Sequence, residues 1–307
     1  MVPVLSDPVS AVEPPANAKM IGTGKGGVGK STIAAHMAAH LAETGARTLL
    51  VCVTAQDDDD LGIVRFERGI HPAGESTLEG KGLFESIVNR TPLRPVREVR
   101  PNLDVVPGGQ MVGEITNILL TRMVTEGAGV ALSLARSLAP IAHWYDEIVF
   151  DSAPENDSLE QLAAGAARHL IVPTRSDISS IKGLRRIARN YRMVRSQVNP
   201  HLRVAGAVLY GSNPSATQMH SEVKVSIREI LGDSAPILST VVGYRERPAV
   251  DARKFGVTFG EYAAALDGDD PRGIARNAQA SSGSSAGLAK DMGTLIDEIL
   301  DYCRRAA

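Results

Sequence analysis

The stretch "GTGKGGVGKST" at residues 22–32 decides how this sequence folds. Gly24, Gly29, Lys30 and Ser31 fit the pattern G-x-x-x-x-G-K-[ST], in which backbone N–H groups surround phosphate oxygens at the start of a helix. A short apolar run precedes the stretch and an apolar pattern of helical spacing follows it, which is the strand–loop–helix context that this motif requires. The sequence therefore predicts a nucleotide-binding loop, with contacts from Gly24, Lys25, Gly26, Gly27, Val28, Gly29, Lys30, Ser31 and Thr32.

A magnesium site is expected beside this loop. The hydroxyl of Ser31 would ligate Mg²⁺, and a second ligand should be an acid at the end of an apolar strand. Asp151 ends the run "EIVFD" and is the candidate, although a strand-end aspartate can also cap a following helix. His36 and His40 stand four residues apart but lack a third metal ligand, so we expect them to be surface or packing residues.

Short apolar runs alternate with helical patterns along most of the chain. Strands are expected at 19–24, where the run ends in the glycine loop, and at 47–53, 103–107, 147–151, 169–174, 204–210 and 235–242. This alternation predicts a single α/β domain with a mainly parallel sheet and helices on both faces. We expect a loose tail at 1–17, the nucleotide-binding domain at 18–266, a low-complexity linker or loop at 267–287 and a helix at 288–307 that packs on the domain.

Composition excludes several classes of protein. The 307 residues carry a formal net charge of −2 and are 43% hydrophobic, an ordinary globular profile that still allows a local basic patch. The two cysteines, Cys52 and Cys303, cannot supply an iron–sulfur ligand set, and the cytoplasm is the default compartment. Neither a signal peptide nor a stretch of membrane-spanning length is expected.

The loop resembles that of a known family. "KGGVGKST" is similar to the deviant Walker A loop of the ParA/MinD ATPases, which carry an additional signature lysine, here Lys25. "VFDSAP", with Asp151 and Pro154, and "RERPAVDARKFG" resemble later segments of that family in the same order, so the likeness extends over about 18–261. It implies ATP and Mg²⁺ as cofactors and a homodimer that sandwiches two ATP molecules, in which Lys25 reaches the partner's nucleotide. Without the resemblance, Lys25 could be a second local phosphate contact.

Two acids that are usual in the family are missing. Where the family usually reads D-x-D-P-Q, this chain has "CVTAQ", so Cys52 and Thr54 replace the aspartates and Gln56 matches. Threonine can orient a water molecule but is no base at neutral pH, so we expect slow ATP hydrolysis, with Lys25, Lys30, Thr54 and Gln56 as catalytic candidates. The aspartates at 57–60 could substitute or could form a solvated loop.

We expect the ATP-bound protein to bind DNA. A helix is expected from about Ser180, with its cations on one face, which could bind phosphates or could be only a solvated face. The candidates are Lys182, Arg185, Arg186, Arg189, Arg192 and Arg195, with a second cluster of Arg245, Arg247, Arg253 and Lys254.

The resemblance favours a ParA-type DNA-partitioning ATPase that is cytoplasmic and nucleoid-associated and is released by a ParB-like adaptor. The alternatives are an ATPase that positions a protein complex and a binding switch with negligible hydrolysis. Acidic residues on the last helix, among them Asp291 and Asp297, argue against membrane binding.

Overall fold

The structure is a computed structural model that describes residues 12–55, 79–153, 155–212, 217–232 and 235–306. Its centre is an eight-stranded sheet in the order β3-β4-β2-β5-β1-β6-β7-β8. Every neighbouring pair is parallel except β3 and β4, which are antiparallel at one edge. The expected fold class, a single α/β domain with a mainly parallel sheet, is confirmed.

The strands are β1 (Ala18–Ile21), β2 (Thr48–Val53), β3 (Val96–Arg100), β4 (Leu103–Val106), β5 (Glu147–Ser152), β6 (His169–Thr174), β7 (Arg203–Ser212) and β8 (Ile237–Gly243). The helices are α1 (Lys30–Glu43), α2 (Lys81–Asn89), α3 (Gln110–Glu126), α4 (Ser133–Ala142), α5 (Asp157–Ala166), α6 (Ile178–Gln197), α7 (Thr217–Leu231), α8 (Glu246–Phe255), α9 (Phe259–Leu266) and α10 (Ser282–Ala306). Two short 3₁₀ helices, η3 (Gly127–Leu132) and η4 (Ala275–Asn277), complete the described elements.

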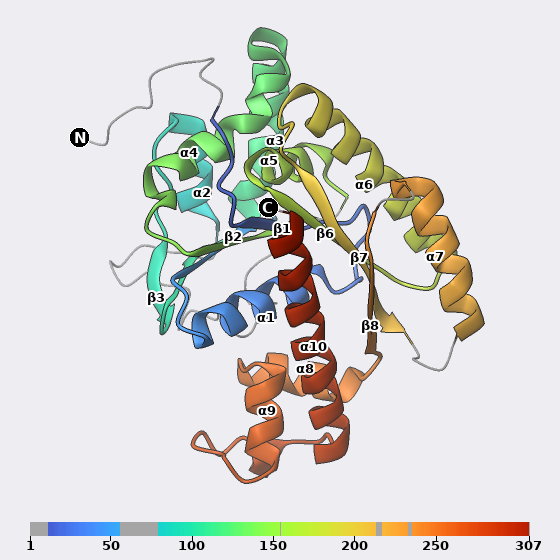
Figure 1. The fold of residues 1–307 in the computed structure, drawn as a ribbon. Coiled ribbons are helices and arrows are strands. Elements are labelled where there is room, and N and C mark those ends of the chain that lie inside the picture. The colour runs from blue at the N-terminus through green and yellow to red at the C-terminus, as the bar shows by residue number, and fades with distance from the viewer. Residues whose placement is uncertain (1–11, 56–78, 154, 213–216, 233–234, 307) are drawn as a thin grey trace.

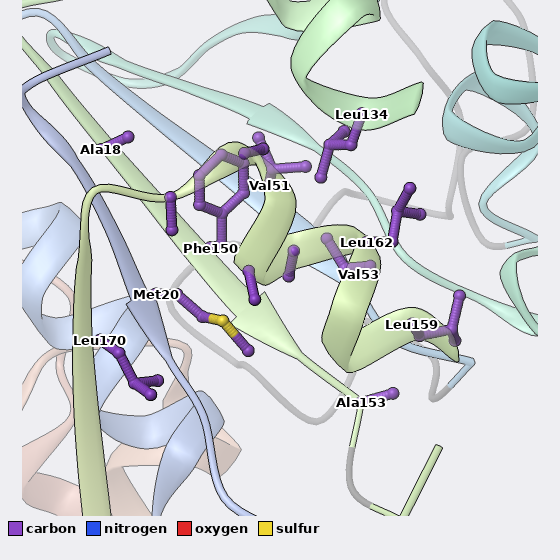
Figure 2. Close-up of a cluster of buried hydrophobic side chains, with 14 of the residues drawn as sticks. Ala18, Met20, Val51, Val53, Leu134, Phe150, Ala153, Leu159, Leu162 and Leu170 are labelled. Atoms are coloured by element: carbon purple, nitrogen blue, oxygen red, sulfur yellow. The ribbon is translucent and has the colours of Figure 1, made fainter. Parts of the chain in front are cut away.

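Helices cover both faces of the sheet (Figure 1). One core joins the sheet to α1, α8, α9 and α10, and the other joins it to α2 to α7. Figure 2 shows part of the second core, where Met20, Val51 and Phe150 of three neighbouring strands meet Leu159 and Leu162 of α5. Because the central strands are buried on both faces, they read as unbroken apolar runs in the sequence.

The segment Gln110–Ala142 differs from the sequence expectation. By length and composition alone its 33 residues could cross a membrane, with a mean hydropathy of 1.4 in the most apolar window. The expectation that no stretch approaches that length was therefore wrong. In the fold this segment is divided among α3, η3 and α4, and Ile115, Leu134 and Leu138 lie in the core, as in the core helices of many soluble proteins.

The last helix begins at Ser282, within the segment 267–287 where a linker was expected. Within that segment, Asp270 accepts backbone hydrogen bonds from Ile274 and Ala275 at 2.6 and 2.9 Å, and the Ile274 side chain is buried. Glu298 of α10 accepts backbone N–H groups of Ser239 and Thr240 in β8. Helix α10 therefore covers the edge of the sheet at β8, which would otherwise present unpaired donors.

Candidate nucleotide site

The loop between β1 and α1 has the backbone shape of a phosphate cradle. Gly27 and Gly29 have φ angles of +73° and +87°, a region that glycine adopts without strain. A Cβ atom at Gly29 would also collide with the Tyr210 ring. Strand β1 pairs with β5 on one side and β6 on the other, so the loop opens at the carboxyl ends of the central strands, where ligands bind in open α/β sheets.

Lys30 is the first residue of α1 and only 5% of it is exposed. Burial lowers the pKa of its ammonium group, and the carboxylates of Asp151, Glu160 and Glu155 oppose this effect. A buried cation at a helix start, surrounded by backbone N–H groups, is suited to phosphate oxygens.

Asp151 lies where the sequence analysis expects the magnesium ligand. Register pairs it with Ile21 of β1 and Cys52 of β2, so it stands beside the loop. The residue is 1% exposed, and neither carboxylate oxygen has a hydrogen-bond partner among the described residues. Burial raises its pKa to about 6, while the Ser31 hydroxyl and the Lys30 charge limit the rise. A buried carboxylate that accepts no hydrogen bond from the described residues, and that lies next to a hydroxyl, fits the oxygen ligands that Mg²⁺ prefers. The ion would supply positive charge beside the phosphates.

Lys25 is paired within its own chain. Its Nζ atom lies 3.0 Å from Oδ1 of Asp177, which caps the N-terminus of α6 by accepting the backbone N–H of Ser180. The loop also packs directly against α6, because a Cβ atom at Gly183 would lie 2.8 Å from the Lys25 Cβ. The signature lysine and helix α6 are thus in direct contact.

Thr54 follows β2 at the same end of the sheet as Asp151. It is 4% exposed, and its carbonyl accepts the Gly109 backbone N–H at 2.9 Å. Gln56, Pro154 and the aspartates at 57–60 lie outside the described residues.

A cavity of about 340 Å³ adjoins the loop on the side of β7. Gly29, Thr32, Tyr210 and Tyr244 line it, together with Arg175, whose guanidinium lies 5.7 Å from the centre of the Tyr244 ring. Arg175 and Tyr244 were not among the residues expected at the site, and no nucleotide contact was assigned to Tyr210. The available signal was their position at or just after the ends of β6, β7 and β8, at the edge where the loop opens.

The second basic cluster is divided between this cavity and the surface. Arg245 and Arg253 line the cavity, and Nη1 of Arg245 lies 2.5 Å from Oδ2 of Asp291. Arg247 and Lys254 are exposed on α8. Two of the four residues expected to form a DNA-binding cluster therefore stand beside the nucleotide cavity.

The cations of α6 lie along a largely exposed face. Lys182, Arg185, Arg189, Arg192 and Arg195 lie at least partly exposed along it, whereas Arg186 is half-buried. Leu184, Ile187 and Val194 fill the opposite side of the helix in the core. Arg192 donates to the Ile230 carbonyl of α7, and Arg186 and Arg189 pair with Asp157 of α5.

A buried acid that the sequence analysis did not single out, Glu160, connects α5 to α6. The residue is fully buried, and its Oε2 atom accepts the Asn190 side-chain N–H at 2.8 Å. Burial raises its pKa to about 7, while Asn190 and Arg186 oppose the rise.

Four features define a P-loop nucleotide-binding protein. They are a glycine-rich loop, a buried lysine at a helix start, a carboxylate without a partner among the described residues, and a cavity of about 340 Å³ beside the loop. Comparison with known proteins agrees, because the family model described as an AAA domain matches residues 18–204. The chain belongs to this family and, within it, to the ParA/MinD-type P-loop ATPases.

Two relatives carry partitioning names. The chromosome-partitioning ATPase Soj of Thermus thermophilus is 29% identical over 240 residues, which cover 78% of this chain and 85% of that protein. The chromosome partitioning protein ParA of Myxococcus xanthus is 29% identical over 203 residues, covering 65% and 66%.

Solved structures share the fold. The Cyanothece McdA(D38A)–ATP complex has a TM-score of 0.65 at 16% identity and covers 93% of this chain and 98% of its own. A putative plasmid partition protein of Borrelia burgdorferi B31 bound to AMPPNP has a TM-score of 0.62 at 18% identity and covers 94% and 98%.

Proposed function

We propose that this protein is a ParA-type DNA-partitioning ATPase. It forms a homodimer around two ATP molecules, binds DNA without sequence preference in that state, and leaves DNA when a ParB-like adaptor stimulates slow hydrolysis. The observation that carries the proposal is Lys25, a second lysine in a loop whose phosphates Lys30 already serves.

Dimerisation follows from the charge of Lys25. In a sandwich dimer each Lys25 would leave Asp177 and contact the nucleotide of the partner subunit. Two lysines brought together in this way repel each other, and phosphate groups between the subunits offset that repulsion. ATP occupancy would then control the association of the two chains.

Slow turnover follows from Thr54. The residue is buried at the carboxyl end of β2, where the family has an acid, and its hydroxyl can orient water without accepting a proton at neutral pH. Phosphoryl transfer depends mostly on positioning and charge, so the loss of a carboxylate slows the reaction without abolishing it. Ser31 and Asp151 would hold Mg²⁺, and Gln56 and Pro154 remain site residues by resemblance.

DNA binding is supported by the exposed cations of α6. Lys182, Arg185, Arg192 and Arg195 can contact phosphates without reading bases, with Arg247 and Lys254 of α8 as further candidates. Binding of this kind weakens steeply as salt is raised, because each phosphate contact releases a condensed counterion. A protein that binds DNA in this way would be cytoplasmic and nucleoid-associated.

The test measures ATP turnover and DNA binding on one preparation, with ATP, with ADP and without nucleotide. The variants are Lys25→Ala and, as a control, Lys290→Ala, which removes an exposed lysine from α10. We expect slow turnover, weak DNA binding with ADP, and tight DNA binding that requires both ATP and Lys25. A protein that binds ATP but never DNA would overturn the proposal and point to a protein cargo. Turnover of many ATP per second by the protein alone would contradict the role given to Thr54.

A further inference from the structure

One carboxylate collects three donors from helix α6. Asp157, the first residue of α5, accepts Nε of Arg186 at 2.7 Å, a terminal nitrogen of Arg189 at 3.2 Å and the amide nitrogen of Asn190 at 2.7 Å. Asp157 is not needed as the cap of α5, because the Asn156 side chain already accepts the Leu159 backbone N–H. Its position is therefore better explained by what it binds on α6.

Asp157 and Arg186 are each connected to the nucleotide site, Asp157 along the chain and Arg186 by packing. Asp157 lies six residues after Asp151, on the segment that leaves the expected magnesium ligand. Arg186 packs against the phosphate loop itself, since a Cβ atom at Gly24 would lie 2.8 Å from the Arg186 Cβ. A conformational change in the phosphate loop or in the segment after β5 would therefore be transmitted to the Asp157–Arg186 ion pair over a short distance.

The chemistry of the pair imitates that of a nucleic-acid contact. Guanidinium groups bind carboxylate and phosphate oxygens with the same donor geometry. The Arg189 and Asp157 side chains are 69% and 40% exposed, so this second ion pair lies at the surface. Arg189 is on the same helix as the exposed cations Lys182 and Arg185. An arginine held in this way cannot contact a DNA phosphate with the same nitrogens.

We propose that Asp157 occupies the place of a DNA phosphate and masks Arg186 and Arg189, so that α6 binds DNA weakly until the ATP-bound state releases the two arginines. This inference rests on the proposed function, because it concerns the regulation of the same DNA-binding helix. The basic face of α6 would then carry two kinds of cation: those that can contact DNA in every nucleotide state, and those that pair with Asp157 until ATP is bound.

The test compares Asp157→Asn with Asp301→Asn by fluorescence anisotropy on a DNA duplex, with ADP and with AMPPNP. The control removes the same charge and also frees an arginine, Arg304, but it lies on α10 at the opposite face of the sheet. With ADP, Asp157→Asn should bind DNA roughly tenfold more tightly than wild type, and its salt slope should steepen by about 1 to 2, near 0.9 for each additional phosphate that the protein neutralises. The gain in affinity should be smaller with AMPPNP, and Asp301→Asn should show none of it.

A second comparison does not require Asp157 to be changed. In the wild type with ADP, Arg189→Ala should cost less than about twofold in DNA affinity, whereas Arg185→Ala should cost roughly fivefold or more. Arg185 is exposed and pairs with no carboxylate among the described residues, so it can contribute a full phosphate contact. In the Asp157→Asn background the cost of Arg189→Ala should rise to that of Arg185→Ala.

The outcomes separate the two proposals. If wild type binds DNA with AMPPNP but Asp157→Asn behaves like Asp301→Asn, or Arg189→Ala costs the same in both backgrounds, masking is refuted and the partition function stands. If neither wild type nor Asp157→Asn binds DNA in any nucleotide state, while both still bind ATP, the proposed function fails and the masking proposal fails with it.

Discussion

The buried imidazole of His36 should make this protein sensitive to mild acid. His36 lies on α1, where Nδ1 donates to the Thr32 carbonyl at 2.8 Å and Nε2 accepts the Phe259 backbone N–H at 3.1 Å. The neutral ring satisfies both partners, whereas a protonated ring has no lone pair for the Phe259 N–H. The change that tests this is His36→Gln, whose amide can donate and accept but does not titrate.

Burial, helped by the charge of Arg100, lowers the pKa of His36 from 6.5 to about 4. Because the folded-state pKa is depressed, the neutral ring stabilises the fold fully above pH 6.5, and this contribution is lost as the pH falls from 6.5 to 4. With these two values the loss of folding free energy between pH 7 and pH 5 is about 2 kcal/mol, and the limit at lower pH is about 3 kcal/mol.

The assay is urea unfolding of wild type and His36→Gln at pH 7, 6 and 5. The variant will be less stable at pH 7, but the wild type should lose about 2 kcal/mol more than the variant on going to pH 5. His169, whose pKa is also lowered to about 4 by burial, is present in both proteins and cancels in the difference. His143→Gln, at an exposed histidine after α4, is the control and should follow the wild type. Parallel stability curves for wild type and His36→Gln would show that the ring is not held neutral by the fold.

Three further predictions concern the nucleotide site. Gly183→Ala should weaken ATP binding roughly tenfold by calorimetry, because its Cβ would press on Lys25 and overpacking costs roughly 1–3 kcal/mol. The control Gly293→Ala, whose Cβ meets open space on α10, should leave the affinity unchanged, and equal losses in the two variants would contradict the contact. Asp151→Asn should abolish the difference in ATP affinity between magnesium and EDTA, and a difference that persists would place the metal ligand elsewhere. Tyr244→Ala should lower the affinities for ATP and ADP by about the same factor, because Tyr244 lines the cavity where we expect the nucleoside to bind. A loss confined to ATP would assign Tyr244 to the γ-phosphate instead.

The central sheet could be predicted from the sequence because its strands are buried on both faces. The run 169–174 was expected as a strand and matches β6 residue for residue. Strand β3 was missed, since "VREVR" has only two apolar positions and lies at the antiparallel edge, where charged side chains reach solvent. Apolar patterning reports burial, so it misses an edge strand whose side chains reach solvent.

Contacts between distant segments could not be predicted in the same way. Lys25 and Asp177 are 152 positions apart, and the cavity beside the loop takes residues from several separate segments. The basic spacing on α6 was readable as a periodic pattern, but its pairing with Asp157 depends on how α5 packs against α6. Helical spacing also made His36 and His40 look equivalent, although His36 is buried against Phe259 and His40 lies near Asp297 at the surface.

The central position of β1 has a consequence for synthesis on the ribosome. This strand is made among the first described residues, yet its two neighbours in the sheet, β5 and β6, are completed only at Ser152 and Thr174. In a nascent chain the phosphate loop therefore lacks the two strands that flank β1 until more than a hundred further residues have been translated. A ribosome-stalled chain that ends before β5 should fail to retain ATP, and capture of nucleotide should begin only once the second half of the sheet has left the exit tunnel.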